Sequence, residues 1–303
     1  MRALGGLAVV LTFIVVVVGA YVRLSDAGLG CPDWPLCYGK PVPADIADSD
    51  ALAKAWKEMG HRYLAGILGV LIAVIMVISW KSRKAQWLAT AIAVLVLFQA
   101  TLGKWTVTML LKPAIVTAHL LGGMTILALL LWLWLSLGSS RTRIPNLRVP
   151  AAMALAVLTV QIALGGWVSA NYAALACPDL PLCLGKAVPP MDFANAFHVM
   201  RELGQTAEGA LLSREALTAI HWTHRLFAVA AFIVIGWAAL RAWRVMQGLA
   251  IAIALLLALQ VALGIANVAL GLPLPLAAAH NAGAALLLCA VVVLNFFSFR
   301  KLA

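Results

Sequence analysis

Charge is scarce in this sequence. Only 11% of its 303 residues are Asp, Glu, Lys or Arg, whereas 64% are hydrophobic. A soluble domain is close to half apolar, so this composition excludes an ordinary soluble protein and predicts a polytopic membrane protein. The sequence also has no low-complexity run in its central linker and no stretch typical of an appended soluble domain. We therefore expect an all-α membrane fold.

Eight apolar stretches can hold the roughly 20 residues that a bilayer crossing needs. They cover residues 3–22, 60–80, 86–108, 113–137, 150–170, 218–240, 248–270 and 275–298. The first stretch, which follows Arg2, can also be interpreted as a secretory signal peptide. We favour a spanning helix, because this stretch leads into a cysteine motif just as 150–170 does in mid-chain, where a cleaved segment needs no counterpart.

Acidic residues are missing from one side of the predicted helix array. Eleven basic residues lie on that side, and all eleven acids fall on the other. The eleven are Arg2, Lys81, Arg83, Lys84, Arg141, Arg143, Arg148, Arg241, Arg244, Arg300 and Lys301. The positive-inside rule predicts cytoplasmic termini and two long outer loops, about 23–59 and 171–217. The net charge of +11 is thus a topology signal, and we expect membrane lipid rather than nucleic acid as a partner.

Two halves of the chain carry the same motifs. The repeats are Gln99-Ala-Thr-Leu-Gly-Lys-Trp-Thr-Val107 with Gln260-Val-Ala-Leu-Gly-Ile-Ala-Asn-Val268, Cys31-Pro-Asp-Trp-Pro-Leu-Cys37 with Cys177-Pro-Asp-Leu-Pro-Leu-Cys183, His61-Arg62 with His224-Arg225, and His119 with His280. We predict two pseudo-symmetric four-helix bundles, 1–138 and 150–303, joined by a cytoplasmic linker at 139–149. Ser49 and Ser213, each before an acid-bearing first turn, are expected N-caps of helices that begin in the outer loops.

Four histidines fall at matched positions inside predicted helices, His61 and His119 in the first half and His224 and His280 in the second. A single intramembrane histidine is usually a hydrogen-bonded packing residue, but a matched pair in each half can bracket a haem iron. We predict two bis-histidine haem sites. Zinc is the alternative metal, although zinc prefers four ligands close together, commonly with cysteine.

Two kinds of neighbour accompany the histidines. His221, three residues before His224, is an alternative ligand, and the match with His61-Arg62 favours His224. Arg62 and Arg225 stand at the outer ends of their helices, where a guanidinium can bind a haem propionate. The alternative for these arginines is to extend to lipid head groups.

One carboxylate breaks the symmetry of the halves. Glu58 precedes His61 by three residues, where the second half has His221. Glu58 is either an exposed acid that favours the start of its helix or a catalytic group that moves protons beside a reactive haem. The difference predicts a reactive site in the first half and an electron-transfer site in the second.

Each cysteine pair encloses five residues, two of which are prolines. In loops that face an oxidising compartment, this spacing predicts the disulfides Cys31–Cys37 and Cys177–Cys183. Both pairs are open to two interpretations, a structural staple and a redox-active dithiol. The fifth cysteine, Cys289, is expected to be a small core residue.

These residues together resemble a known family. Gly28-Leu-Gly-Cys31-Pro-Asp-Trp-Pro-Leu-Cys37, Glu58-x-x-His61-Arg62, Gln99-x-x-Leu-Gly and His280-Asn281 are similar to motifs of the bacterial haem A synthases, relatives of the mitochondrial enzyme, over essentially the whole chain. The resemblance implies an oxidoreductase that converts the C8 methyl group of haem O to a formyl group by successive hydroxylations. It places haem b, the electron-transfer cofactor, on His224 and His280, and substrate haem O between His61 and His119, with Glu58 important for the reaction.

The resemblance also implies the bacterial cytoplasmic (inner) membrane, with haem O synthase and terminal-oxidase assembly factors as partners. Three other functions stay open from the residues alone: a membrane cytochrome with two fixed haems, a haem transporter or chaperone, and a quinone-linked thiol oxidant. The cytochrome leaves Glu58 unexplained, and the thiol oxidant leaves four histidines without a role.

Overall fold

The computed structural model describes residues 1–44, 46–138 and 144–300, so that Arg141, Arg143 and Lys301 of the predicted basic rim, and part of the predicted linker, lie outside the described residues. Within these ranges the fold is helical, with isolated β-bridges in the loops. Eight helices there are long and apolar enough to cross a membrane, which confirms the predicted polytopic all-α class. They are α1 (Arg2–Leu24), α2 (Ser49–Ser82), α3 (Gln86–Thr108), α4 (Pro113–Ser136), α5 (Arg148–Ala170), α7 (Arg214–Ala242), α8 (Gln247–Ala269) and α9 (Leu274–Phe299). A 3-10 helix, η1 (Pro145–Leu147), precedes α5, and a short helix, α6 (Phe193–Ala196), lies in the second long loop.

The helix starts follow local capping chemistry. Ser213 caps α7 as expected, because its hydroxyl accepts a hydrogen bond from Ala216 N–H at 3.1 Å. The expectation that Ser49 caps α2 is wrong by one residue. Asp48 is the cap, since its carboxylate accepts from Asp50 N–H at 3.0 Å and Ser49 is already helical. Both helices begin within the long loops.

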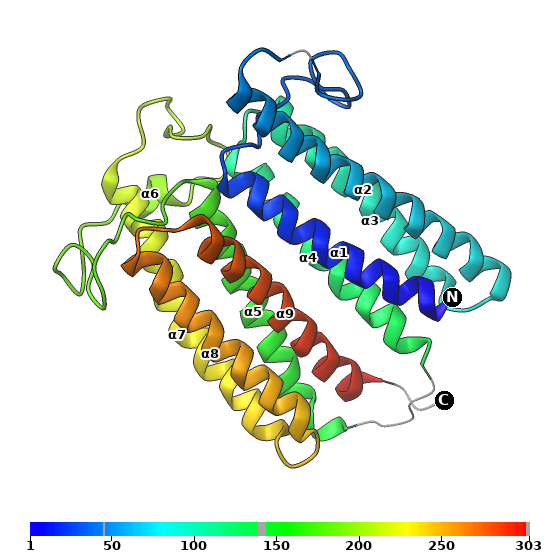
Figure 1. Ribbon diagram of the computed structural model, residues 1–303. Helices are drawn as coiled ribbons and strands as arrows, with labels where there is room; N and C mark the ends of the chain where they lie inside the picture. The colour runs from blue at the N-terminus through cyan, green and yellow to red at the C-terminus, as the bar shows by residue number, and fades with distance from the viewer. Residues whose placement is uncertain (45, 139–143, 301–303) are drawn as a thin grey trace.

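The helices pack in two groups that have the same internal contacts. In the first half α1 contacts α2, α2 contacts α3, α3 contacts α4, and α4 returns to α1. In the second half α5, α7, α8 and α9 contact one another in the same cyclic order. The halves meet through α1 and α4 on one side and α5 and α9 on the other. Figure 1 shows both long loops at one end of the helices and the N-terminus and the end of α9 at the other.

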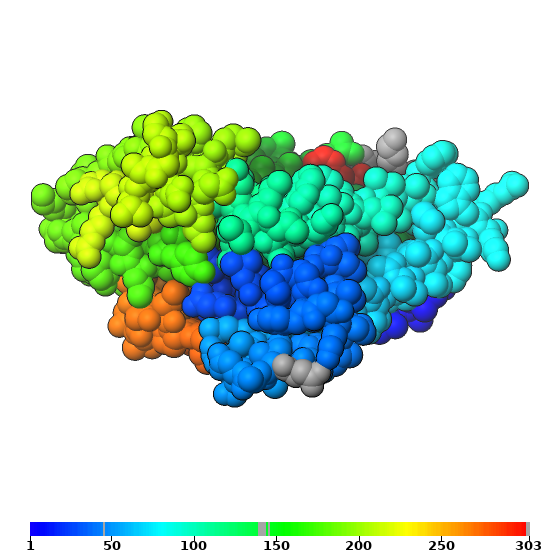
Figure 2. All heavy atoms as spheres, turned by 90° about the horizontal axis from the view of Figure 1, so that it is seen from above, coloured from blue at the N-terminus to red at the C-terminus, as the bar shows by residue number. Residues whose placement is uncertain are grey.

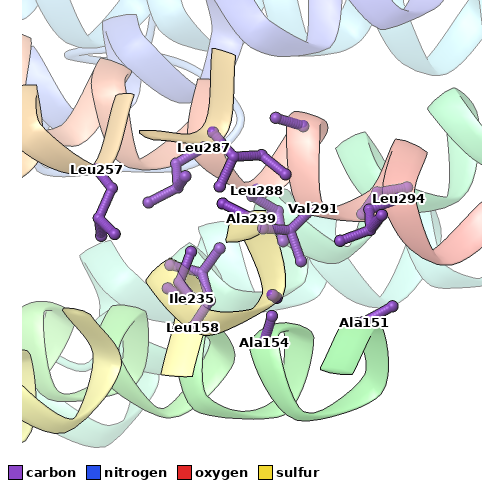
Figure 3. Close-up of a cluster of buried hydrophobic side chains, with 14 of the residues drawn as sticks. Ala151, Ala154, Leu158, Ile235, Ala239, Leu257, Leu287, Leu288, Val291 and Leu294 are labelled. Carbon is purple, nitrogen blue, oxygen red and sulfur yellow. The ribbon is translucent and has the colours of Figure 1, made fainter. Parts of the chain in front are cut away.

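The core of the second half is built from small and branched side chains (Figure 3). Alanines of α5 and α7 face leucine and valine side chains of α9 in one buried cluster. Labelled members are Ala151, Ala154, Leu158, Ile235, Ala239, Leu257, Leu287, Leu288, Val291 and Leu294. Because lipid is as apolar as these residues, close van der Waals packing rather than the hydrophobic effect holds the helices together.

Polar contacts join the halves at the end that carries the long loops. Arg23 of α1 donates to the carbonyl of Ser169 at 2.8 Å, and its guanidinium lies 3.9 Å from the centre of the Tyr172 ring. Lys112, in the turn before α4, pairs with Glu202 of the second long loop at 2.8 Å. Figure 2 shows this loop, in yellow-green, beside the teal α3–α4 turn. The second loop therefore reaches over the first half.

Candidate functional site

The two cysteine loops have the same local structure. Both predicted disulfides, Cys31–Cys37 and Cys177–Cys183, are formed, and Cys289 is unpaired and partly buried in the core. In each loop a backbone bridge joins the second cysteine to a lysine three residues later, and the peptide bond before the second proline inside the disulfide ring is cis. The loops are therefore equivalent structures as well as equivalent sequences.

An aspartate organises each cysteine loop. Asp33 accepts hydrogen bonds from the N–H groups of Tyr38 and Gly39 at 2.7 and 2.9 Å. Asp179 accepts from Leu184 and Gly185 at 2.6 and 2.8 Å. The amide donors, that of Gly185 first, stabilise the carboxylate and hold the pKa of Asp179 below its ordinary value. These aspartates shape the loops, a role that the sequence pattern alone did not assign.

Arg62 and Arg225 lie beneath the loops and bind their backbone carbonyl groups. Arg62 Nη1 donates to Asp33 O at 3.0 Å and Leu36 O at 2.9 Å. Arg225 donates to Asp179 O at 2.9 Å and to Cys177 O at 2.6 Å. Each guanidinium therefore fastens one cysteine loop to the helix that carries a predicted iron ligand.

Glu58 is buried, with only 4% of its surface exposed, so its interpretation as an exposed helix-start acid is wrong. One carboxylate oxygen accepts from Cys31 N–H at 2.9 Å, and the other forms a close ion pair with Arg62. In the second half His221 takes the same place. It is also buried, and its Nδ1 accepts from Cys177 N–H at 3.2 Å. In each half the N–H group of the first cysteine is thus hydrogen-bonded to the side chain at the same position of the helix below.

The first half brings His61 and His119 together. Their ring centroids are 6.4 Å apart, and the ring planes are nearly perpendicular at 82°. Imidazole nitrogens that each bond one metal ion at about 2 Å place their ring centres roughly 6 Å apart. The spacing therefore fits two axial ligands of one iron. In the second half the rings of His224 and His280 lie close enough to interact electrostatically, and His221 instead contacts the cysteine loop.

Each of these four histidines packs against a glycine of a neighbouring helix. A Cβ on Gly19 would lie 2.8 Å from the His61 ring, and one on Gly103 would lie 3.1 Å from the His119 ring. In the second half the contacts are Gly165 to His224 at 3.2 Å and Gly264 to His280 at 3.5 Å. At Gly19 no side chain fits without moving the imidazole. The glycines thus set the positions of the rings.

Glutamines four residues before these glycines reach toward the histidines. Gln99 donates to the His119 carbonyl at 2.6 Å. The amide nitrogen of Gln161 lies 3.2 Å from His224 Nδ1 and donates to the His224 carbonyl at 3.3 Å. Gln161-Ile-Ala-Leu-Gly165 is a third copy of the motif at Gln99 and Gln260, and the sequence analysis missed it. The matching segment of α1 is Val15-Val-Val-Val-Gly19, so His61 alone has valine at this place.

Several nitrogen atoms of the buried imidazole rings have no hydrogen-bond partner within the protein. The Nδ1 atoms of His61, His119 and His280 are buried without a hydrogen-bond partner. Buried polar atoms nearly always have partners, and those that do not commonly mark functional positions. Together with the 6.4 Å spacing, this donor set fits a haem iron in the first half. Among the described residues no group of three or more His, Cys, Asp or Glu side chains is placed to hold a metal ion.

A buried arginine in the second loop was not anticipated. Arg201 is 1% exposed, donates to Asn171 Oδ1 at 2.5 Å and lies 5.6 Å from the Trp167 ring centre. Burial lowers its pKa. His198 of the same loop is exposed. Arg201 anchors the loop to the end of α5, and no repeat in the sequence pointed to it.

The sequence of this chain is similar to those of several known proteins. A "Heme A synthase" of Shewanella oneidensis is 43% identical, over 97% of this chain and 96% of the relative. Proteins of the same name from Halalkalibacterium halodurans and Alkalihalophilus pseudofirmus are 26% and 27% identical, over 75% and 79% of this chain and 77% and 81% of their own lengths. Residues 2–292 match the model of the family COX15-CtaA, described as "Cytochrome oxidase assembly protein". The chain, which carries two histidine pairs on a duplicated helical frame, therefore belongs to the COX15-CtaA family.

Proposed function

We propose that this protein is a haem A synthase, an oxidoreductase that converts the C8 methyl group of haem O to a formyl group by successive hydroxylations. The relatives' name and the family match support the overall reaction. The observation that carries the assignment of roles is the difference between two equivalent sites. Both have a histidine pair and a cysteine loop, but only the first has a buried carboxylate, Glu58, at the loop contact.

The second half is proposed to hold haem b on His224 and His280. When bound, haem b supplies electron transfer at this site. Gln161 fixes the orientation of His224 through its contacts with Nδ1 and the carbonyl group. Arg225 Nε is buried without a partner, so it remains free to donate to a haem propionate while the other nitrogens hold the loop. These contacts suit a permanently bound group.

The first half is proposed to bind the substrate, haem O, between His61 and His119. Glu58 is the carboxylate of this half that is buried near the histidine pair, where it forms an ion pair with Arg62, and a carboxylate so placed can accept a proton. Oxidation of a methyl group releases protons, and Glu58 is proposed to receive them. Arg62 is proposed to serve both the loop carbonyl groups and a substrate propionate.

The proposed location is the bacterial inner membrane, with both termini cytoplasmic and the cysteine loops outside. The basic residues at the end of the helices that carries Met1 support this orientation, as do the disulfides, which form in oxidising compartments. The helical ends opposite Met1 then face outward, and Glu58 lies in the first three turns of α2 at that end. Haem O synthase and terminal-oxidase assembly factors are the proposed partners.

The test is haem analysis of cells that make this protein together with haem O. We expect extracted haem to contain haem A, and purified protein to retain haem b. Two permanently bound haems with no change in haem O would instead identify an electron-transfer cytochrome. Exchangeable, chemically unchanged haem O would identify a transporter or chaperone.

A further inference from the structure

The face of α1 that runs inward from His61 is apolar along its whole length. Gly19 packs on the His61 ring, and Val15, Leu11 and Leu7 follow at four-residue intervals toward Met1. Residues spaced by four share one face of a helix. Val15 and Leu11 both pack against the same buried cluster of the first half. An apolar stripe therefore begins at the histidine and continues along the helix.

This stripe leads into a furrow between α1 and α2. The furrow has a volume of about 410 Å³ and is lined by four residues of α1 between Leu7 and Ile14 and four of α2 between Ile67 and Val74, all of them aliphatic. Most of these residues are also exposed on the surface, for example Val70 at 67%. Ile67 is six residues beyond His61, which is about 9 Å along the axis. The furrow thus opens toward lipid, on the two helices that carry Gly19 and His61.

The matching positions of the second half differ in a way that bears on this furrow. Val10 corresponds to Ala156 and Ile67 to Ala230, whereas Val74 corresponds to Trp237, so the lining of the furrow is not repeated there. Val15 corresponds to Gln161, whose amide is turned to His224. An apolar path from the histidine is therefore interrupted by a polar group in the half proposed to hold haem b.

We propose that the furrow between α1 and α2 binds the isoprenoid side chain of the substrate haem. This inference rests on the proposed function. Haem O carries a hydroxyethylfarnesyl chain where haem b has a small vinyl group, so only the substrate needs an extended apolar groove beside its iron ligands. Lateral opening lets the chain enter from the bilayer while the ring moves between His61 and His119. Val15 continues the groove up to the ring.

The test compares the binding of haem O and haem b to purified protein in nanodiscs that already holds its resident haem b. Titration is followed by difference absorption spectra. Wild type is expected to prefer haem O by about tenfold or more, the range that hydrophobic pocket contacts give. Val70→Trp, which fills the furrow, is expected to reduce the preference toward one with haem b binding unchanged. The matched control is Ile233→Trp at the equivalent exposed position of α7, which should behave as wild type.

The outcomes separate this inference from the proposed function. Equal binding of both haems to wild type, or an unchanged preference in Val70→Trp, would overturn the proposal that the furrow binds the isoprenoid chain. The same results are expected if a lipid acyl chain occupies the furrow. If such a protein still forms haem A, the enzyme assignment stands without the furrow. If haem O is preferred and never oxidised, the furrow stands and the enzyme assignment falls. The resident haem b spectrum shows that each variant is folded.

Discussion

The two halves of this protein share one arrangement of helices but surround their histidines with different side chains. Both place a histidine against a glycine of the preceding spanning helix, and both tie the first cysteine to a residue three before that histidine. They differ in what surrounds the ring. His224 has an amide from Gln161, whereas His61 has valine on that side and Glu58 toward the loop. A duplicated scaffold therefore needs only a few substitutions to give its two histidine pairs different surroundings.

The largest expected effect is the loss of the second site. His224→Ala and His280→Ala should each abolish the stable low-spin haem b, because an axial ligand is removed. Absorption spectra of purified variants measure this. His221→Ala is the matched control and should keep haem b, since its imidazole is engaged with Cys177 N–H. Loss of haem b in His221→Ala with retention in His224→Ala would transfer the ligand role to His221.

Replacement of Glu58 tests the asymmetry itself. Glu58→Gln keeps the size and the hydrogen bond from Cys31 but removes the charge. We expect haem A formation to fall by about a hundredfold or more, the usual contribution of an acid–base group, with haem b unaffected. Haem extraction and chromatography from cells supplied with haem O should show haem O or a hydroxylated intermediate accumulating. Wild-type yields of haem A would leave Glu58 with a purely structural role.

The variant Gln161→Val places in the second half the valine that the first half has at the matching position, Val15. Removal of the amide leaves His224 without its side-chain partner, and loss of such a partner typically weakens a metal site by about 10- to 100-fold. Haem b retention during dialysis and its midpoint potential are the measurements. The reciprocal variant, Val15→Gln, should leave haem b unchanged. If Gln161→Val retains haem b and its potential like wild type, the amide does not orient the ligand.

The smallest effect concerns the loop. A Cβ on Gly30 would lie 2.6 Å from the carbonyl of Lys54, which is backbone and cannot easily move, so Gly30→Ala should push the loop away from α2. Overpacking of this kind costs about 1–3 kcal/mol. Thermal unfolding should show a lower midpoint. Ala176→Gly, at the equivalent place in the second loop, should change it less, and equal shifts would show that the loops are packed alike.

The sequence predicted most of the helices because long apolar runs leave little choice of where a chain crosses lipid. The run at 86–108 matches α3 to the residue, and the ends of α2 and α7 were harder because they extend into polar loops. The disulfides were predictable since the two cysteines of each pair are six positions apart. Local sequence was enough in these cases.

The partners of Glu58 and Arg62 were not predictable, because they depend on how a loop folds back onto a helix. A carboxylate three residues before a histidine indicates a shared face, but nothing in that spacing reveals the Cys31 N–H or the loop carbonyl groups. The signal for Gln161 was present as a third copy of Gln-x-x-Leu-Gly. It was overlooked since 63 positions, including the second long loop, separate Gln161 from His224, compared with 20 between Gln99 and His119. The furrow required side-chain packing to be seen.

The ion pair between Lys112 and Glu202 has a mechanical consequence. Lys112 is the cap residue of α4, the helix that bears His119, and Glu202 adjoins Arg201, which is anchored to the end of α5 through Asn171. A displacement of the second loop is therefore transmitted as a pull on the helix of the opposite half. The second long loop thus links the two helix groups at the ends that carry the long loops.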